Sequence, residues 1–256
     1  MRKIISVANQ KGGVGKTTTA INLSASLAAA EKTTLLIDAD SQGNASSGMG
    51  ITAKDIKDKN LYRCLIDNYP LSQAAIKTQM PHLDIVPANQ DLVGVELEFI
   101  SLADREKRLK TLLRNLETDY DYIIIDCPPS LGFLTVNALV ASDCLLVPLQ
   151  CEYFAMEGLG NLLNTLEIVR KHLNPTLYLA GILLTMYDSR NLLSRRVSDD
   201  VRSHFGDLVF KTLIPRNVRL SESPSHGLPI ILYDIKSRGA VSYMELAEEI
   251  INNGRV

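Results

Sequence analysis

A glycine-rich loop with two lysines lies near the start of the chain, in the stretch NQKGGVGKTTT from Asn9 to Thr19. An apolar run precedes the loop and helix-forming residues follow it, so glycine N–H groups and the positive end of a helix would face the same anion. The loop departs from the usual G-x-x-x-x-G-K-[ST] pattern, because Gln10 stands five residues before Gly15, where that pattern has glycine. This context predicts a site for nucleotide phosphates, formed by Gly12, Gly13, Val14, Gly15, Lys16, Thr17 and Thr18.

Two side chains of the loop have defined tasks in such a site. The Lys16 ammonium would reach the β- and γ-phosphates, and the Thr17 hydroxyl would be a ligand of Mg²⁺. The second lysine, Lys11, stands four residues before Gly15 and has no task in an ordinary phosphate loop. The loop by itself does not explain why one site should carry two lysines.

Three aspartates follow apolar runs and would lie at one edge of a sheet. Asp38 and Asp40 close the run TLLIDAD, and Asp126 closes the run YIIID. Ligands of open α/β folds bind at the carboxyl ends of the strands, where the phosphate loop would also lie. We therefore expect Asp126 to face Mg²⁺ through a bound water, as a Walker-B carboxylate does. An aspartate at a strand end can instead simply cap the next turn, and the residues alone leave that alternative open.

Short apolar runs alternate with amphipathic segments along the chain. Several runs lack polar alternation, which is typical of strands buried on both faces of a parallel sheet. The alternation predicts an α/β fold, a doubly wound and mostly parallel sheet with helices on both faces. We expect a single domain over residues 1–256, and the segment Ile51–Met80 has no assignable pattern. The expected strands begin at Lys3, Thr34, Leu83, Tyr122, Cys144, Leu179 and Leu208; the expected helices are Thr17–Ala30, Asp104–Glu117, Met156–Leu173, Leu192–Phe205 and Ala240–Asn252.

Composition narrows the class of protein. The chain has 256 residues, 46% hydrophobic and 22% charged, which is ordinary for a globular domain. There is no apolar run of about 18 residues, and the start MRKIISVANQ leads directly into the loop, so we expect a cytoplasmic protein without a signal peptide. Its four cysteines lie far apart and predict reduced, buried thiols. The net charge of −2 argues against a surface that is positive throughout, but it is compatible with a local basic patch.

Six segments together resemble one known family. They are KGGVGKTT, DADSQGNAS, IIIDCPPS, PLQCEYFAMEGL, TMYDSR and IPRNVRLSESPSHGLPI. The chain resembles the ParA/Soj family of chromosome- and plasmid-partitioning ATPases, in the deviant Walker-A class of P-loop NTPases that also contains MinD and the nitrogenase iron protein. The resemblance extends from Lys3 to about Asn253.

The resemblance implies an ATP- and Mg²⁺-dependent homodimer with catalytic residues Lys11, Lys16 and Asp40. Lys11 would cross the dimer interface to the phosphates held by the partner chain, so each of the two lysines serves one nucleotide. Two facing ATP molecules repel one another, and cations from both chains would offset that repulsion. Asp40 would orient the attacking water and act on Mg²⁺ through water, although Ser41 stands where the family usually has proline. Hydrolysis would be slow until a ParB-type centromere-binding protein completes the site, and Pro215 and Asn217 of IPRN would lie against the adenine.

Charge suggests where DNA could bind. The segment Met186–Leu220 has seven basic and four acidic residues, a local charge of +3. Such a bias is also compatible with a solvated helix face. The resemblance favours DNA, since Arg190 and Arg219 match family positions that contact double-stranded DNA non-specifically. We accordingly expect a nucleoid-associated protein.

Two other classes share the scaffold. A MinD-like ATPase, which positions itself on membranes, should end in a basic amphipathic helix, whereas here Glu245, Glu248 and Glu249 are opposed only by Arg255. We therefore expect no membrane association. A metabolic enzyme such as an amidoligase or an iron–sulfur reductase would need a substrate domain or suitably placed cysteines, and neither is evident.

Overall fold

The computed structural model describes residues 2–99, 104–152 and 155–252. Its central sheet has eight strands in the order β3-β4-β2-β5-β1-β6-β7-β8. Every neighbouring pair is parallel except β3 with β4. The strands are β1 (Lys3–Val7), β2 (Thr34–Asp38), β3 (Ile76–Lys77), β4 (Leu83–Val86), β5 (Tyr122–Asp126), β6 (Cys144–Gln150), β7 (Tyr178–Tyr187) and β8 (Val209–Pro215).

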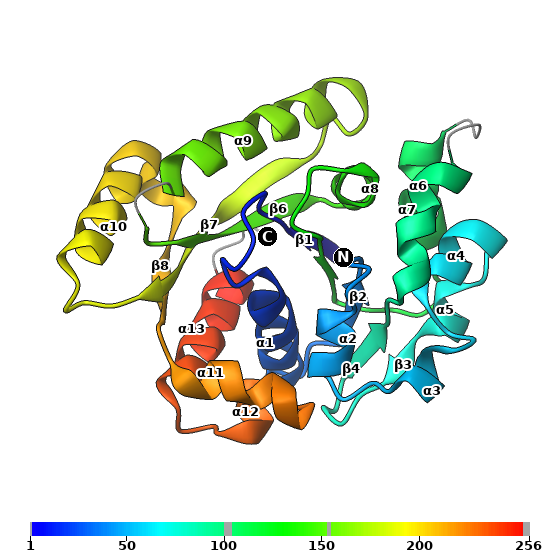
Figure 1. Cartoon of the computed structure of the whole chain (residues 1–256), viewed down its shortest axis with the longest axis horizontal. Helices are drawn as coiled ribbons and strands as arrows, with labels where there is room; N and C mark the ends of the chain where they lie inside the picture. The colour runs from blue at the N-terminus through cyan, green and yellow to red at the C-terminus, as the bar shows by residue number, and fades with distance from the viewer. Residues whose placement is uncertain (1, 100–103, 153–154, 253–256) are drawn as a thin grey trace.

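Helices cover both faces of the sheet (Figure 1). The long helices α1 (Lys16–Ala29) and α13 (Arg238–Asn252) pack together on one face. The other face carries α7 (Arg108–Arg114), α8 (Phe133–Ala141), α9 (Ala155–His172) and α10 (Leu192–Phe205). The shorter helices are α2 (Asn44–Gly48), α3 (Ala53–Ile56), α4 (Leu61–Asp67), α5 (Leu71–Ala74), α6 (Val95–Glu98), α11 (Val218–Glu222) and α12 (Ile230–Tyr233).

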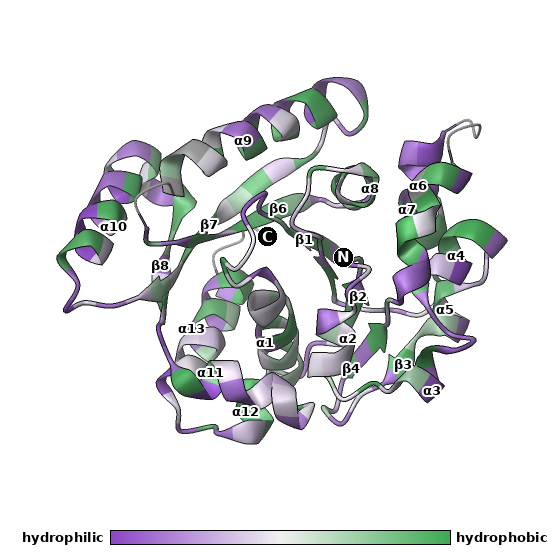
Figure 2. Ribbon diagram, in the orientation of Figure 1, coloured by the Kyte–Doolittle hydropathy of each residue, from purple (hydrophilic) through white to green (hydrophobic). Residues whose placement is uncertain are grey.

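The core consists of two hydrophobic clusters, one on each side of the sheet. Successive residues of a strand point to opposite faces, so Ile123 and Ile125 join the α7–α10 side while Ile124 joins the α1 side. Figure 2 shows hydrophobic colour along the strands and mixed colours along the outer helices α9 and α10. Double burial explains why the strand sequences are continuously apolar. The predicted doubly wound, mostly parallel α/β fold is confirmed.

Several parts of the fold were not predicted, among them the short helices α2, α6, α11 and α12. The segment Ile51–Met80 contains α3, α4, α5 and the two-residue edge strand β3, elements too short to show a periodicity. Helix α8 has the sequence FLTVNALVA and is largely buried, so it presents no polar stripe that would mark it as amphipathic.

Strand register gathers the candidate residues. Asp126, the last residue of β5, pairs in register with Val7 of β1 on one side and Asp38 of β2 on the other. The loop between β1 and α1 leaves from the same edge. Parallel neighbours therefore place the loop and both carboxylates side by side.

Candidate functional site

The glycine-rich loop is anchored before any ligand arrives. Gly13 and Gly15 have φ of 74° and 86°, in the left-handed region that glycine adopts without steric cost. Asn9 ties the loop to β6, because its Nδ2 donates to the Pro148 carbonyl at 2.8 Å and its Oδ1 accepts from the Lys11 N–H at 3.0 Å. These bonds fix the loop's shape, so an anion would find the backbone already arranged.

Lys16 lies within this loop. Its side chain is buried, and its Nζ donates to the Lys11 carbonyl at 3.0 Å. Burial lowers the pKa of Lys16, while the nearby negative charge of Asp126 acts in the opposite direction. The ammonium therefore sits inside the loop, where it would meet phosphate oxygens.

Asp126 is the residue that points most directly to a cation-binding role. Its exposed fraction is 0%, and among the described residues neither carboxylate oxygen has a hydrogen-bond partner. Burial, followed by the negative charge of Asp38, raises the pKa of Asp126 well above its usual range. The Thr17 hydroxyl lies close enough to act against that rise, although it makes no hydrogen bond of normal geometry with the carboxylate. A buried carboxylate without donors requires a positive partner, and carboxylate and hydroxyl oxygens are ligands that Mg²⁺ prefers.

The described residues fit Mg²⁺ as part of a nucleotide complex. Within residues 2–99, 104–152 and 155–252, no group of three or more His, Cys, Asp or Glu side chains could hold a metal ion without help. Mg²⁺ commonly keeps one or two protein ligands and takes the rest from phosphates and water. Asp126 and Thr17 would supply these one or two protein ligands.

Asp38 supports the neighbouring loop. Its oxygens accept from the Ser46 N–H at 2.8 Å, the Ser46 hydroxyl at 2.7 Å and the Asp40 N–H at 3.2 Å. Burial raises its pKa to about 6, and the bonds from Ser46 oppose that rise. Asp38 thereby holds the backbone that carries Asp40.

Asp40 lies at the same edge of the sheet. Its side chain is 7% exposed, and its Oδ1 accepts from the Gln42 N–H at 3.0 Å. Its negative charge acts on the pKa values of both Lys16 and Asp126. The structure thus brings Asp40, Lys16 and Asp126 into one electrostatic cluster.

A cavity of about 450 Å³ adjoins the loop. Gly15 and Thr18 line one side, and Pro215 and Asn217 line the other. The Asn217 Oδ1 caps α11 by accepting from the Leu220 N–H at 3.3 Å, which leaves its Nδ2 as a donor. The predicted phosphate and adenine residues therefore border one continuous space.

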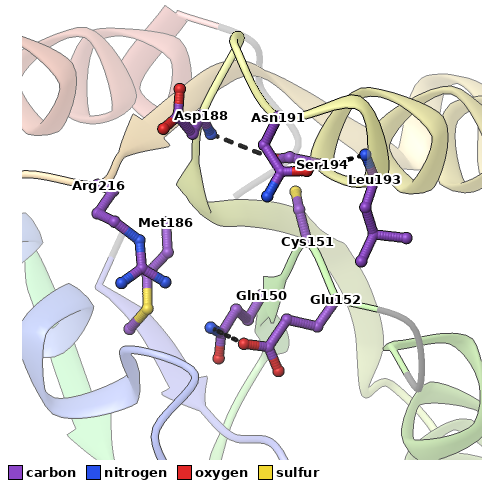
Figure 3. A pocket seen from close by; sticks show the side chains of 9 residues that line it. All are labelled: Gln150, Cys151, Glu152, Met186, Asp188, Asn191, Leu193, Ser194 and Arg216. Carbon is purple, nitrogen blue, oxygen red and sulfur yellow. Dashed lines mark hydrogen bonds between the residues drawn. The ribbon is translucent and has the colours of Figure 1, made fainter.

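Lys11 points away from its own loop. Its Nζ lies 2.9 Å from the Glu152 Oε2, and the two side chains are 39% and 46% exposed. Glu152 also accepts from Gln150, and both residues line a pocket of about 440 Å³ beyond the end of β6 (Figure 3). The sequence did not indicate this ion pair, although Glu152 belongs to the segment PLQCEYFAMEGL.

Arg190 and Arg219 lie outside the nucleotide cavity, and each is ion-paired. Arg190 binds Asp188 through Nε at 3.1 Å and through a terminal nitrogen at 3.0 Å. Arg219 lies 2.9 Å from a Glu222 oxygen and 3.6 Å from an Asp234 oxygen. Both guanidiniums are on the surface, but a phosphate would have to compete with carboxylates for them.

Two further residues of the site were not predicted. The Thr185 hydroxyl donates to the Val14 carbonyl at 2.8 Å and ties the phosphate loop to β7. The buried Tyr243 hydroxyl lies 3.1 Å from the Thr19 hydroxyl and links α13 to α1. A polar residue at the end of an apolar strand was the available signal for Thr185; no local pattern marks Tyr243, which is 224 residues from its partner.

Comparison with known proteins identifies the family. A family model described as an AAA domain matches residues 2–179. The sporulation initiation inhibitor protein Soj of Bacillus subtilis is 54% identical over 254 residues, covering 99% of this chain and 100% of that protein. The chromosome partitioning protein ParA of Myxococcus xanthus is 54% identical over 249 residues, covering 97% and 88%. The chain belongs to the ParA/Soj family.

A solved structure agrees with the ParA/Soj fold. The cobyrinic acid a,c-diamide synthase from Mycobacterium smegmatis, with bound ADP and magnesium, has a TM-score of 0.87 and 38% identity, and the match covers 100% of this chain and 96% of that one. The resemblance that the motifs indicated is confirmed. None of the described helices of this ParA/Soj chain is long and apolar enough to cross a bilayer.

Proposed function

We propose that this chain is an ATP-dependent dimeric switch for partitioning chromosomes or plasmids. In the ATP state it dimerises and binds double-stranded DNA non-specifically, and a ParB-type partner then stimulates hydrolysis. The names of its relatives, a chromosome partitioning protein ParA and a Soj protein at 54% identity, support the partitioning role. We further propose that residues 1–256 act as one domain, because a single sheet contains strands from β1 to β8.

The proposal that ATP and Mg²⁺ bind at the glycine-rich loop rests on one observation. The buried ammonium of Lys16 lies near the buried carboxylate of Asp126, which has no hydrogen-bond partner among the described residues. The loop N–H groups and Lys16 would hold the phosphates, Thr17 and Asp126 would face Mg²⁺, and Asn217 would face the adenine. Bound Mg²⁺ neutralises the phosphates and polarises the γ-phosphoryl group. The ADP and magnesium bound by the M. smegmatis protein support this assignment.

The second lysine connects nucleotide binding to dimerisation. The Lys11–Glu152 pair is about half exposed, and such pairs contribute only about 0–1 kcal/mol to stability. The phosphates of a nucleotide on another copy carry more charge than one carboxylate and can therefore replace Glu152 as the partner of Lys11. Lys11 would then contact ATP only across a dimer interface.

Hydrolysis uses Asp40 to orient the attacking water. Asp40 is mostly buried; its Oδ1 accepts from the Gln42 N–H, and its own N–H donates to the Asp38 Oδ1, so the carboxylate is positioned before any ligand binds. We propose that the reaction remains slow until a basic segment of the ParB-type partner adds a cation near the phosphates, as arginine fingers do. The nucleotide state then acts as a timer for a nucleoid-associated dimer.

Lys11→Ala tests the dimer, and Glu152→Gln is its matched control. Lys11→Ala should bind ATP with near-parental affinity but remain monomeric in analytical ultracentrifugation, whereas Glu152→Gln should still dimerise with ATP. If Lys11→Ala forms the ATP-dependent dimer, the role of Lys11 across the interface is wrong. DNA binding of the parent in ATP, ADP and no nucleotide tests the switch itself, and equal binding in all three states would contradict it.

A further inference from the structure

Two glycines hold the backbones of two distant segments against each other. Gly50 lies just after α2, and Gly227 follows the 3₁₀ helix η4 (Ser223–His226). A Cβ added at Gly227 would lie 2.7 Å from the Gly50 Cα, and a Cβ added at Gly50 would lie 3.0 Å from the Gly227 carbonyl oxygen. Gly50 and Gly227 have positive φ, of 76° and 65°. A side chain at either position would therefore push the two segments apart.

The segment that contains Gly50 also positions Asp40. Asp38 accepts from the Asp40 N–H at 3.2 Å and from the Ser46 N–H at 2.8 Å, so one carboxylate holds both the backbone of Asp40 and the first turn of α2. The Ser46 hydroxyl oxygen in turn accepts from the Ala88 N–H at 3.0 Å, beyond the end of β4. A shift of α2 at its Gly50 end is consequently transmitted to the backbone of Asp40.

The segment that contains Gly227 forms part of the wall of the nucleotide cavity. Pro224 of η4 lines that cavity, and so does Asn217 at the start of α11, which the sequence predicts to lie against the adenine. Pro224 also lies close to α2, since a Cβ added at Gly48 would be 3.6 Å from the Pro224 Cβ. A single proline ring thus separates the space predicted for the adenine from the helix that follows Asp40.

Helix α1 packs against both segments. The Oδ1 of its Asn22 accepts from the Ile230 N–H at 2.7 Å, which fixes the start of α12 shortly after Gly227. Helix α2 lies equally close to α1, because a Cβ added at Gly48 would be 2.7 Å from the Ile21 Cδ1. Figure 1 shows α2 and α12 next to α1, which begins at the phosphate loop. Because elements packed this closely leave no free space between them, a displacement of η4 has to displace α2 as well.

We propose that the Gly50–Gly227 contact makes η4 a positioning element for Asp40, so that the nucleotide base affects the rate of hydrolysis as well as binding. The inference rests on the proposed function, in which Asp40 orients the attacking water. An adenine beside Pro224 would hold η4 against α2, and α2 would hold Asp40 in place. A smaller base leaves that space partly unfilled, so η4 and α2 are less constrained. A misplacement of about 1 Å in an orienting group is enough to slow a reaction roughly a hundredfold.

The test compares Gly227→Ala with Gly206→Ala in the full chain. Gly206 has φ 52° and ψ −123°, outside the regions allowed to alanine, but among the described residues a Cβ there would meet no atom within 4 Å apart from its chain neighbours. Gly206→Ala therefore gains backbone strain without separating two segments. Gly227→Asn is a second variant, because asparagine tolerates a left-handed φ better than alanine yet still adds the Cβ. Urea denaturation shows which variants are folded.

Hydrolysis of ATP and of CTP, each measured with Mg²⁺ over a range of concentrations, gives kcat and KM. Folded Gly227→Ala and Gly227→Asn should hydrolyse ATP roughly tenfold to a hundredfold more slowly than the parent, with KM near the parental value because Lys16 and Asn217 are unchanged. Gly206→Ala should keep the parental kcat. The parent should have a lower kcat for CTP than for ATP, and in Gly227→Ala that difference should disappear, because the contact that links the base to Asp40 is lost.

Three outcomes would overturn the inference. A parental kcat for ATP in the folded Gly227 variants would show that the contact does not position Asp40. An equal loss in Gly206→Ala would assign the loss to backbone strain. Equal kcat values for ATP and CTP in the parent would show that the base acts on binding alone, and this comparison needs no variant. A parental rate of hydrolysis in Asp40→Ala would instead overturn the proposed role of Asp40, and this inference with it, whereas the first three outcomes leave that role intact.

Discussion

The phosphate-loop edge and the basic surface hold their charged side chains in different ways. At the loop, Lys16 is 7% exposed and Asp126 is 0% exposed. On the surface that carries Arg190 and Arg219, the two side chains are 89% and 54% exposed; both are paired with neighbouring acids, and Arg219 also lies against the Tyr233 ring. The first region buries charged groups that have few partners, whereas the second exposes charged groups that are already paired.

This difference in burial predicts a different free-energy balance of ligand binding at the two regions. At the loop, the folded chain already carries the desolvation penalty of the buried Asp126 carboxylate, and a bound cation would offset that penalty. On the surface, a phosphate must displace a carboxylate, and the net gain from each exchange is small because solvent screens both pairs. Nucleotide binding should therefore depend on single residues, while DNA binding should depend on many.

The largest effect is expected at Lys16. Lys16→Ala removes the buried ammonium that we propose to face the phosphates, so we expect nucleotide affinity to fall by about 4 kcal/mol, or roughly a thousandfold. Lys16→Gln is neutral, retains all but one atom of the side chain's length and still carries an N–H donor, and it should fail equally. Isothermal titration with ATP and Mg²⁺ checks both variants; tight binding by Lys16→Gln would mean that charge is not what the loop requires.

Much of the fold was predictable because local sequence carried the information. Strands buried on both faces need continuous apolar runs, so seven of the eight strands were predicted; β3, with only two residues, has no such run. Helix α10 was predicted as Leu192–Phe205 because its buried and exposed residues alternate at helical spacing. Helix α8 was not, because nearly every position in it is apolar.

The candidate site was predictable in part, for a similar reason. A glycine loop after a strand and aspartates at strand ends are local patterns, and strand register then brings them together. The Lys11–Glu152 pair joins residues 141 apart and has no local signal. The pairing of Arg190 with Asp188 was visible in TMYDSR, two residues apart, but a count of segment charge does not show which charges cancel.

The second largest effect is expected on hydrolysis, at Asp40 of the buried phosphate-loop edge. Asp40→Ala should retain ATP, because binding depends on Lys16, but should lose roughly a hundredfold to a thousandfold in hydrolysis, since the water is no longer oriented. The dimer should then remain on DNA. Phosphate release measured under single-turnover conditions checks this, and a parental rate in Asp40→Ala would remove Asp40 from the mechanism.

The third effect is a pH dependence of stability without nucleotide. The pKa of Asp38 is raised from 3.8 to about 6 in the folded state, so between those pH values the folded chain holds a proton that the unfolded chain has released. The free energy of unfolding should consequently fall as pH rises from about 4 to about 6, by roughly 3 kcal/mol from this group.

Comparison with Asp38→Asn isolates that contribution. The variant has no titrating group at this position, and its lost hydrogen bond with Ser46 or Asp40 costs a similar amount at every pH. The difference in unfolding free energy between parent and variant, from urea denaturation at pH 4 to 7, should shift in favour of the variant as pH rises. A constant difference would show that burial does not strain the Asp38 carboxylate.

The smallest effect is expected on the ion-paired surface, where Arg190→Ala and Arg219→Ala act on DNA binding alone. Each substitution removes one potential phosphate contact per chain, and two per dimer. Each should therefore lower the salt slope by roughly two and weaken binding to all sequences alike. ATP binding and dimerisation should persist because both residues lie outside the nucleotide cavity. Unchanged affinity and slope in the double variant would place the DNA surface elsewhere.

Asp188→Asn tests the same surface in the opposite direction. The Arg190 guanidinium holds the pKa of Asp188 down to about 2, so this carboxylate is charged at any working pH and competes with phosphate. The amide keeps an oxygen for the Arg190 N–H that Asp188 accepts at 3.0 Å, so the loop should keep its shape. Freed of its carboxylate, Arg190 should bind DNA a few-fold more tightly in the ATP state at about 0.1 M salt, and this gain should shrink as salt screens both partners. If Arg190 touches phosphate, Arg190→Ala should weaken binding and Asp188→Asn should strengthen it. Two variants that move affinity in the same direction would remove Arg190 from the DNA surface.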